Sequence, residues 1–376
     1  MDQVFSPAPE AEDQPSSKLV IPKIRCRSTD IHIARPAGFV QPILNQLRRL
    51  VHRGGPEVEE TPEWGMPSYQ LVWSLLLALA WMRGAEATAF AQAAAPYQLF
   101  ARTNLVVWCI VPFDAKHRGP AERAEMVARL GIGKVAYDWR EPHVPTFEQE
   151  ILEYRKQGLE YFAFWDTHDK AFELFKKHGL HPQIWLTAPG PEAPTRDEQV
   201  RKAAAQLLPV VERTRRAGCR LGLYNHGGWG GEPENLVAVC EYLRQHHDAA
   251  HVGIVYNFHH GHDYIGDFAR SLDHMKPYLL CLNINGMITN GDKQGKLILT
   301  LAQGDKELAM LRVVEQSGWH GPIGILCHRD DADAGLVLAD NLDGLEWLKK
   351  ALAKPGSGGG GAQAGATRTA RRYEVI

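Results

Sequence analysis

Residues 220–257 read RLGLYNHGGWGGEPENLVAVCEYLRQHHDAAHVGIVYN. This segment begins with a short apolar run, passes through a polar loop into residues with a helical period, and ends in a second apolar run. Both apolar runs are continuous rather than alternating, which is typical of strands covered on both faces in a parallel sheet. The segment therefore predicts one strand–helix–strand unit, with strands at 220–224 and 253–257 and a helix at 236–246.

The same pattern repeats eight times between residues 104 and 352. Eight such units in roughly 250 residues are the count and size of a (β/α)8 barrel, so we predict an α/β fold with a single TIM-barrel domain at 104–353. A doubly wound open sheet is the alternative, but the Gly-rich turn that would follow its first strand is absent, and residues 111–116 read VPFDAK. The expected strands are 105–111, 134–137, 161–165, 183–186, 220–224, 253–257, 279–284 and 323–327. The expected helices are 122–130, 147–157, 170–178, 198–217, 236–246, 264–275, 305–317 and 342–352.

The composition is that of an ordinary globular protein. The chain has 376 residues, of which 44% are hydrophobic and 23% charged, with 42 basic against 44 acidic side chains. This balance offers no electrostatic footprint for a nucleic-acid backbone, so we expect no nucleic-acid partner. Six cysteines without C-x-x-C spacing are too few for a disulfide scaffold or a cysteine zinc site, and the five within the predicted barrel are expected to be small buried hydrophobes.

The two ends of the chain differ from its middle. Residues 1–65 lack sustained periodicity and are expected to be a disordered extension. The apolar run 69–82 is too short for a stable membrane span, and with Ala89-Phe-Ala91 it makes 66–91 a candidate signal peptide, a buried helix being the alternative. A signal peptide there predicts an exported or periplasmic protein, and its absence a cytoplasmic one. Residues 354–376 are expected to be a flexible Gly-rich tail.

Polar and aromatic residues gather where the predicted strands end. Active sites of barrel enzymes lie at the C-terminal ends of the strands, so these residues are the candidates for a site. Indole rings pack against the C–H faces of sugars, while amides and carboxylates bind hydroxyl groups, so the set predicts a carbohydrate or polyol pocket. The predicted substrate-binding residues are Trp139, Trp165, Asp166, Trp185, Asn225, Trp229, Asn257, Asn283 and Asn285.

Five histidines also fall at three of these strand ends. Histidines that converge on one rim indicate proton transfer or metal binding. We predict His226, His259 and His328 as catalytic residues, with His226 and His259 also as candidate metal ligands. His260 and His262 complete the set, and the adjacent His259 and His260 are expected to diverge.

Residues 104–352 resemble the xylose-isomerase-like TIM barrels, the superfamily of sugar phosphate isomerases and epimerases and of endonuclease IV. The resemblance rests on LYNHGGW at 223–229, VGIVYNFH at 252–259, GPIGI at 321–325 and NLDGLEW at 341–347. It implies a divalent metal ion (Mn, Mg, Co or Zn) bound in part by His226 and His259. Members commonly carry carboxylates at two further positions, where this chain has Tyr224 and Tyr256, and Asn283 stands where a histidine is often found. The usual glutamate of the eighth strand has no counterpart.

Three functions remain open on this basis. The first is a sugar isomerase or epimerase that transfers a proton beside a carbonyl, with a histidine as the base. The second is a lyase or hydrolase of a modified glycoside, for which Asp138, Asp166 and Glu232 are eligible carboxylates. The third is a non-catalytic carbohydrate-binding barrel that has lost its metal. In each case the expected partner is a small carbohydrate, and a homo-oligomer is compatible with the sequence.

Overall fold

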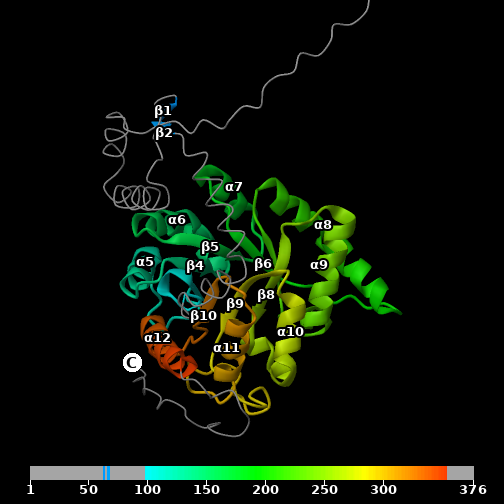
Figure 1. The fold of residues 1–376 in the computed structure, drawn as a ribbon. Helices are drawn as coiled ribbons and strands as arrows, with labels where there is room; N and C mark the ends of the chain where they lie inside the picture. The colour runs from blue at the N-terminus through cyan, green and yellow to red at the C-terminus, as the bar shows by residue number, and fades with distance from the viewer. Residues whose placement is uncertain (1–61, 64–65, 68–97, 354–376) are drawn as a thin grey trace, which may run out of the picture. The chain divides into compact units, whose positions relative to one another are not determined.

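The structure is a computed structural model that describes residues 62–63, 66–67 and 98–353 (Figure 1). The chain divides into two compact units, Met1–Ala94 and Ala95–Ile376. In the first unit β1 (Pro62–Glu63) pairs antiparallel with β2 (Met66–Pro67). Apart from these four residues, the segments 1–65 and 66–91 lie outside the described residues, as does 354–376. The predictions of an extension, a signal peptide and a tail concern those segments.

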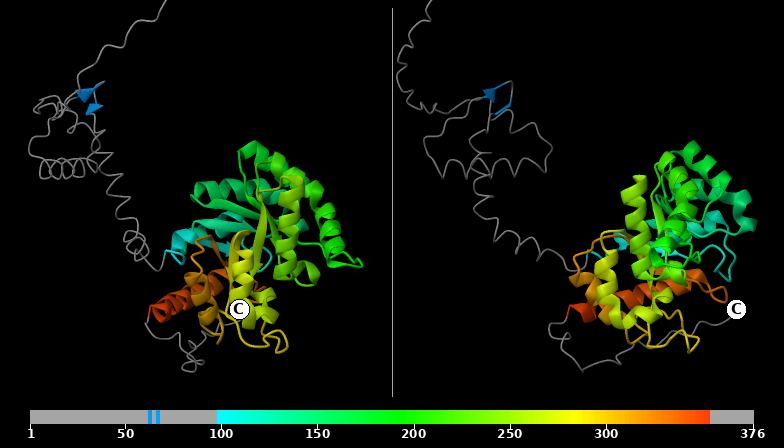
Figure 2. Two further views of the ribbon diagram at one scale, coloured as in Figure 1. Left: turned by 45° about the vertical axis from the view of Figure 1, so that its right-hand side comes forward. Right: turned by 90° about the vertical axis from the view of Figure 1, so that its right-hand side faces the viewer.

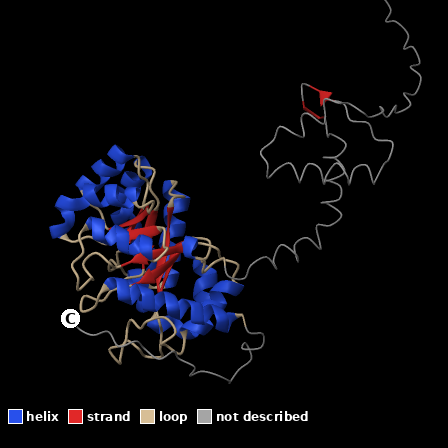
Figure 3. Ribbon diagram, turned by 90° about the vertical axis from the view of Figure 1, so that its left-hand side faces the viewer, coloured by secondary structure: helices blue, strands red, loops and turns tan. Residues whose placement is uncertain are grey.

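A closed barrel of eight parallel strands forms the centre of the second unit (Figure 3). Each strand pairs with the next in sequence, and β10 closes the ring on β3 with Ile323 opposite Leu105. The predicted (β/α)8 barrel is therefore confirmed. The strands are β3 (Leu105–Trp108), β4 (Lys134–Tyr137), β5 (Glu160–Trp165), β6 (Gln183–Thr187), β7 (Leu221–Tyr224), β8 (Val252–Asn257), β9 (Leu279–Ile284) and β10 (Ile323–Leu326).

Helices follow the strands and surround the barrel (Figure 2). None of the helices in the described part of the chain is long and apolar enough to cross a membrane. The helices are α5 (Pro120–Arg129), α6 (Phe147–Lys156), α7 (Asp169–His178), α8 (Arg196–Arg216), α9 (Pro233–His247), α10 (Phe268–Met275), α11 (Glu307–Gln316) and α12 (Ala334–Leu352).

Two helix starts differ from the sequence prediction by four residues or more. The last helix begins at Ala334, eight residues before the predicted start, because the Asp333 carboxylate caps it by accepting a hydrogen bond from the backbone N–H of Gly335. The sixth helix begins late, because residues His262–Asp267 form the separate 3-10 helix η5 before α10. Both differences lie at the C-terminal side of a strand, where the loops carry the site.

The interior of the barrel is filled by large aromatic side chains. Trp185 is fully buried there, and its ring centroid lies 5.0 Å from that of Trp108 in an edge-to-face contact. Gly222 makes room for this ring, because a Cβ at that position would lie 2.9 Å from Trp185 Cδ1 and 2.5 Å from Val255 Cγ2. The barrel is thus a packed core, and its C-terminal mouth is hollow.

Candidate active site

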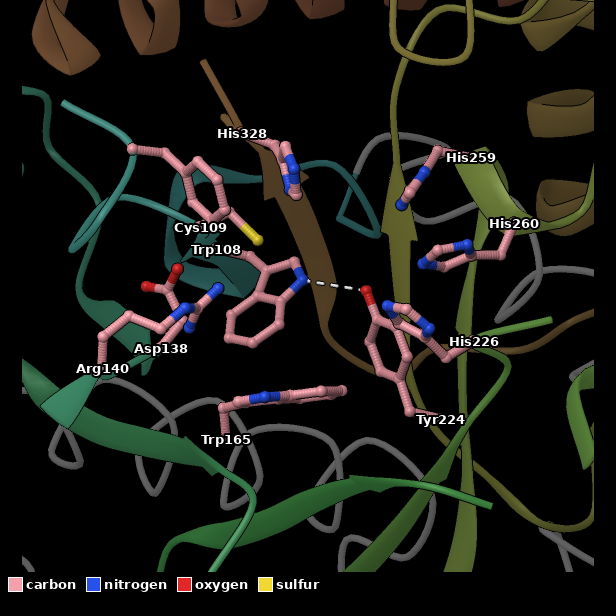
Figure 4. A pocket seen from close by; sticks show the side chains of 11 residues that line it. Trp108, Cys109, Asp138, Arg140, Trp165, Tyr224, His226, His259, His260 and His328 are labelled. Atoms are coloured by element: carbon pink, nitrogen blue, oxygen red, sulfur yellow. Dashed lines mark hydrogen bonds between the residues drawn. The ribbon is translucent and has the colours of Figure 1, made fainter. Parts of the chain in front are cut away.

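A cavity of about 190 Å³, open to solvent, lies at the C-terminal ends of the barrel strands (Figure 4). Its walls come from the ends of β3, β4, β5, β7, β8 and β10, which are far apart in sequence and meet only because the barrel is closed. The lining residues are Trp108, Cys109, Phe113, Asp138, Arg140, Trp165, Tyr224, His226, His259, His260 and His328.

Three aromatic side chains pack against one another in the cavity. Trp165 lies edge-to-face on Tyr224, with ring centroids 5.0 Å apart, and is tilted against Trp108 at 5.8 Å. Trp108 Nε1 donates a hydrogen bond of 3.0 Å to the Tyr224 hydroxyl, which also accepts one from Asn257 Nδ2. Burial raises the pKa of Tyr224 well above its ordinary value, so the phenol stays neutral. The rings therefore form a rigid, uncharged surface.

Four imidazoles gather on one side of this aromatic surface. The ring centroids of His226 and His260 are 4.5 Å apart, those of His259 and His260 3.5 Å, and those of His259 and His328 5.9 Å. Burial lowers the pKa of His259 to about 2 and that of His260 to about 3, with the neighbouring imidazoles adding to both effects. Burial also lowers the pKa of His328, with Arg140 adding to the effect. These three rings are therefore neutral at pH 7.

The other side of the cavity holds the one carboxyl group among its described lining residues. Asp138, directly after β4, is 1% exposed, and its Oδ1 accepts hydrogen bonds from the backbone N–H groups of Ile110 (3.3 Å) and Val111 (3.2 Å). Its Oδ2 is buried and has no hydrogen-bond partner among the described residues. Burial raises the pKa of Asp138 to about 7, although the Val111 N–H and the Arg140 guanidinium lower it in part. A carboxyl group of this kind exchanges protons near neutral pH.

Four of the predicted site residues line the cavity. His226, His259 and His328 lie on its wall together with Trp165 (Figure 4). His226 is exposed at the mouth, whereas His259 and His328 are partly buried. The expected divergence of His259 and His260 does not occur, since both rings line the cavity in contact with each other. Both residues belong to the short 3-10 helix η4 (Phe258–His260), which follows β8.

The other three predicted indoles do not line the cavity. Trp185 lies below Trp108 inside the barrel, and its Nε1 donates a hydrogen bond to Gln183 Oε1. Trp139 packs between strand and helix, edge-to-face on Phe147, and is therefore turned away from the barrel axis. Trp229 is partly buried in the 3-10 helix η3 (Trp229–Gly231).

The four predicted substrate-binding asparagines and Asp166 are also away from the cavity wall. Asn225 and Asn257 join β7 to β8, because Asn225 Nδ2 donates to the Asn257 carbonyl (3.0 Å) and Asn225 Oδ1 accepts from the Asn257 N–H (2.7 Å). Asn283 and Asn285 are fully buried, and Asn285 Nδ2 donates to the carbonyl of Gly286. Asp166 is exposed, and its carboxylate accepts a hydrogen bond from the next backbone N–H.

Sequence reasoning overlooked the first strand's contribution to the site. It placed 105–111 in one strand, but β3 ends at Trp108 because Cys109 has a left-handed φ of 59°. This turn brings Trp108, Cys109 and Phe113 to the cavity, and Arg140 joins them from the loop after β4. An apolar Val-Val-Trp-Cys-Ile-Val run carries no sign of such a turn, so only the backbone geometry reveals these residues.

The donor groups do not fit the metal centre that the resemblance implies. Within residues 98–353 no group of three or more His, Cys, Asp or Glu side chains is arranged to hold a metal ion. At one of the two positions where family members have carboxylates, the Tyr224 hydroxyl is engaged by Trp108 and Asn257. At the other, Tyr256 is fully buried and does not line the cavity.

Comparisons with known proteins identify the fold. No family model matches the sequence, and no curated protein matches it. Among solved structures, protein SMc04130 from Sinorhizobium meliloti 1021 is 17% identical, with a TM-score of 0.51, over 66% of this chain and 99% of that chain. The 3-keto-D-glucoside 4-epimerase YcjR from E. coli is 14% identical, with a TM-score of 0.49, over 66% and 99%.

A fusion protein titled as a xylose isomerase-like TIM barrel with a 4-hydroxyphenylpyruvate dioxygenase is 15% identical, with a TM-score of 0.49, over 67% of this chain and 43% of that chain. At these identities the likeness concerns the fold. The predicted resemblance is confirmed at that level, and the fold is an eight-stranded parallel barrel with its cavity at the carboxyl ends of the strands.

Proposed function

We propose that this chain is a sugar isomerase- or epimerase-like enzyme that moves a proton on a carbon atom beside a carbonyl group. One observation carries the proposal: four imidazoles, of which burial keeps at least three neutral, converge on one cavity beside a cluster of aromatic rings. Neutral imidazole is the form that accepts a proton, and burial both keeps these rings neutral and weakens them as bases. The proposal therefore rests on where the imidazoles lie, at the wall of one cavity.

The cavity suits a monosaccharide. Small-molecule sites combine apolar walls with a few placed polar groups, and this cavity has both. Trp108 and Trp165 supply apolar ring surface for the C–H groups of a sugar. The imidazole nitrogens supply donors and acceptors for its hydroxyl groups, and His259 Nδ1 is buried without a hydrogen-bond partner among the described residues.

The catalytic roles follow from exposure and charge. We assign the base to His226 or His259, with His328 assisting, as the sequence predicts. His226 is exposed at the mouth and reaches an entering substrate directly. Removal of a proton beside a carbonyl leaves negative charge on oxygen, and the Arg140 guanidinium lines the cavity where it can stabilise that charge.

Solvent exchange tests the proposal whichever sugar the reaction forms. The full-length chain is incubated in D2O with D-glucose, D-fructose, D-xylose or D-galactose, and loss of the proton signal beside the carbonyl carbon is followed by NMR. We expect enzyme-dependent exchange with at least one sugar and its loss in His226→Gln. The exposed His320, which does not line the cavity, provides the control variant His320→Gln. Saturable sugar binding without exchange would instead support the carbohydrate-binding barrel.

A further inference from the structure

Asp138 and the histidines of η4 come from opposite sides of the barrel. In the closed ring of eight strands, β4 and β8 are separated by three strands in either direction. Asp138 directly follows β4, while His259 and His260 directly follow β8. Figure 4 shows Asp138 and Arg140 on one side of Trp108 and the imidazoles of His226, His259 and His260 on the other. A substrate lying between them therefore meets a carboxyl group on one face and imidazoles on the other.

The contacts of the Asp138 carboxyl group fix one of its oxygens and leave the other without a partner among the described residues, which fits a role in proton transfer. Its Oδ1 is fixed by the N–H groups of Ile110 and Val111, which sets the plane of the carboxyl group. Its Oδ2 remains buried without a hydrogen-bond partner among the described residues, although the side chain lines the cavity. A buried polar atom normally has a partner, and a substrate hydroxyl group at this position would supply one.

We propose that Asp138 is a second proton-transfer group of the site and acts on the substrate face opposite the imidazoles, so that the reaction inverts a carbon centre. This inference rests on the proposed function. It extends that function from proton transfer in general to epimerisation, because a base on one face and an acid on the other deliver the new proton to the side opposite the one that was lost.

The protons balance in each direction. In one direction a neutral imidazole takes the proton from carbon and becomes imidazolium, the C–H electron pair forms the enediolate, and protonated Asp138 gives its proton to the other face and becomes a carboxylate. The imidazolium then loses a proton to water and the carboxylate gains one, which restores the starting state. In the reverse direction the Asp138 carboxylate is the base and the imidazolium is the acid.

On its side of the cavity, Asp138 is the group whose pKa lies near neutral pH. The thiols of Cys109 and Cys327 and the phenol of Tyr137 are neutral there, because burial raises the pKa of each well above its ordinary value. Arg140 and Arg123 are the cations whose charge reaches the carboxyl group, and both lower its pKa. The forward rate should therefore fall as pH rises through about 7, where Asp138 loses the proton that it donates.

The first test needs no substrate. Infrared difference spectra of the full-length chain are recorded across a pH titration, and the carboxylic-acid C=O band is compared between the wild type and Asp138→Asn. We expect a protonated carboxyl band that disappears around pH 7 in the wild type and is absent in the variant. Asp263→Asn, which removes an exposed carboxylate outside the cavity, should keep the band. A band equally present in wild type and Asp138→Asn would overturn the proposal.

The second test separates Asp138 from the proposed function. With a sugar that exchanges in D2O, Asp138→Asn should keep exchange at the imidazole face but lose inversion by at least about 100-fold, the typical contribution of one general acid or base. The amide of the variant still offers an oxygen to the two N–H groups, so the loop keeps its anchor. In Asp138→Ala, added formate should restore inversion in a saturable way.

Inversion at the wild-type rate in Asp138→Asn would refute the inference alone, and the absence of exchange with every sugar would refute it together with the proposed function.

Discussion

Asp138→Asn should stabilise the folded protein at alkaline pH, in addition to its effect on catalysis. The Asp138 carboxyl group is 1% exposed, and burial raises its pKa from an ordinary value of 3.8 to about 7. Between these two values the folded chain keeps the proton and the unfolded chain releases it. The stability linked to this proton is therefore fully present below pH 3.8 and is lost as pH rises through 7. An asparagine has no charge to bury and so loses nothing over this range.

The size of the effect follows from the difference between the two pKa values. Each pKa unit corresponds to about 1.4 kcal/mol, so a difference of about three units costs the wild type about 4 kcal/mol at alkaline pH. About 1.5 kcal/mol of this cost is already present near pH 5. The stability advantage of Asp138→Asn should therefore grow by about 3 kcal/mol from near pH 5 to near pH 8.5. The retained oxygen in the asparagine side chain keeps the hydrogen bonds from Ile110 and Val111, so the comparison isolates the charge.

Urea unfolding followed by tryptophan fluorescence measures this difference on the full-length chain. Both proteins are unfolded at a series of pH values, and the difference in their unfolding free energies is plotted against pH, so that titration of all other groups cancels. Asp263→Asn provides an exposed-carboxyl control, for which the difference should stay flat. A pH-independent difference between the wild type and Asp138→Asn would refute the reasoning, because it would mean that Asp138 titrates alike in the folded and unfolded chains.

Three further predictions concern the cavity and the core. His226→Ala and His259→Ala should each abolish solvent exchange into sugar. The circular dichroism spectrum and the unfolding midpoint of both variants should stay close to those of the wild type. Exchange at the wild-type rate in either variant would exclude that residue as the base. Arg123→Ala should lower the unfolding free energy by about 3–5 kcal/mol, measured in urea, because it leaves the fully buried Glu150 carboxylate without its 2.7 Å partner. Cys281→Ala should cost about 1 kcal/mol through a small cavity in the barrel and leave exchange unchanged.

The barrel could be predicted from sequence because its signals are local and repeated. Strands buried on both faces have continuous apolar runs, and two of the predicted strands, Lys134–Tyr137 and Leu279–Ile284, have the bounds found in the structure. The helix starts were harder to predict, because they depend on loop geometry. The early start of α12 follows from the Asp333 cap, and the late start of α10 from a 3-10 turn, and neither changes the apolar period that the prediction used.

The site could be predicted only in part. The sequence indicates how far along the barrel axis a residue lies, but not whether its side chain points into the cavity, into the barrel or toward a helix. His226, His259 and His328 come together because loops after different strands meet at one mouth. Trp139 and Trp185 lie near the same level, yet one ring packs outward against a helix and the other fills the barrel below the cavity. Which of these directions a side chain takes depends on packing with residues distant in sequence.

Burial explains the shifted pKa values of several side chains at this site. A carboxylate in place of Tyr224 would add a negative charge beside the imidazoles and raise their pKa toward the protonated form, because opposite charge favours the charged state. The tyrosine instead stays neutral and is fixed by Trp108 and Asn257. The same lack of solvent that lowers the pKa of His259 and His260 raises that of Asp138, so burial favours the uncharged form of the titratable groups on both sides of the cavity. A single physical cause thus sets the protonation states on both sides of the cavity, and the neutral Tyr224 adds no charge to either.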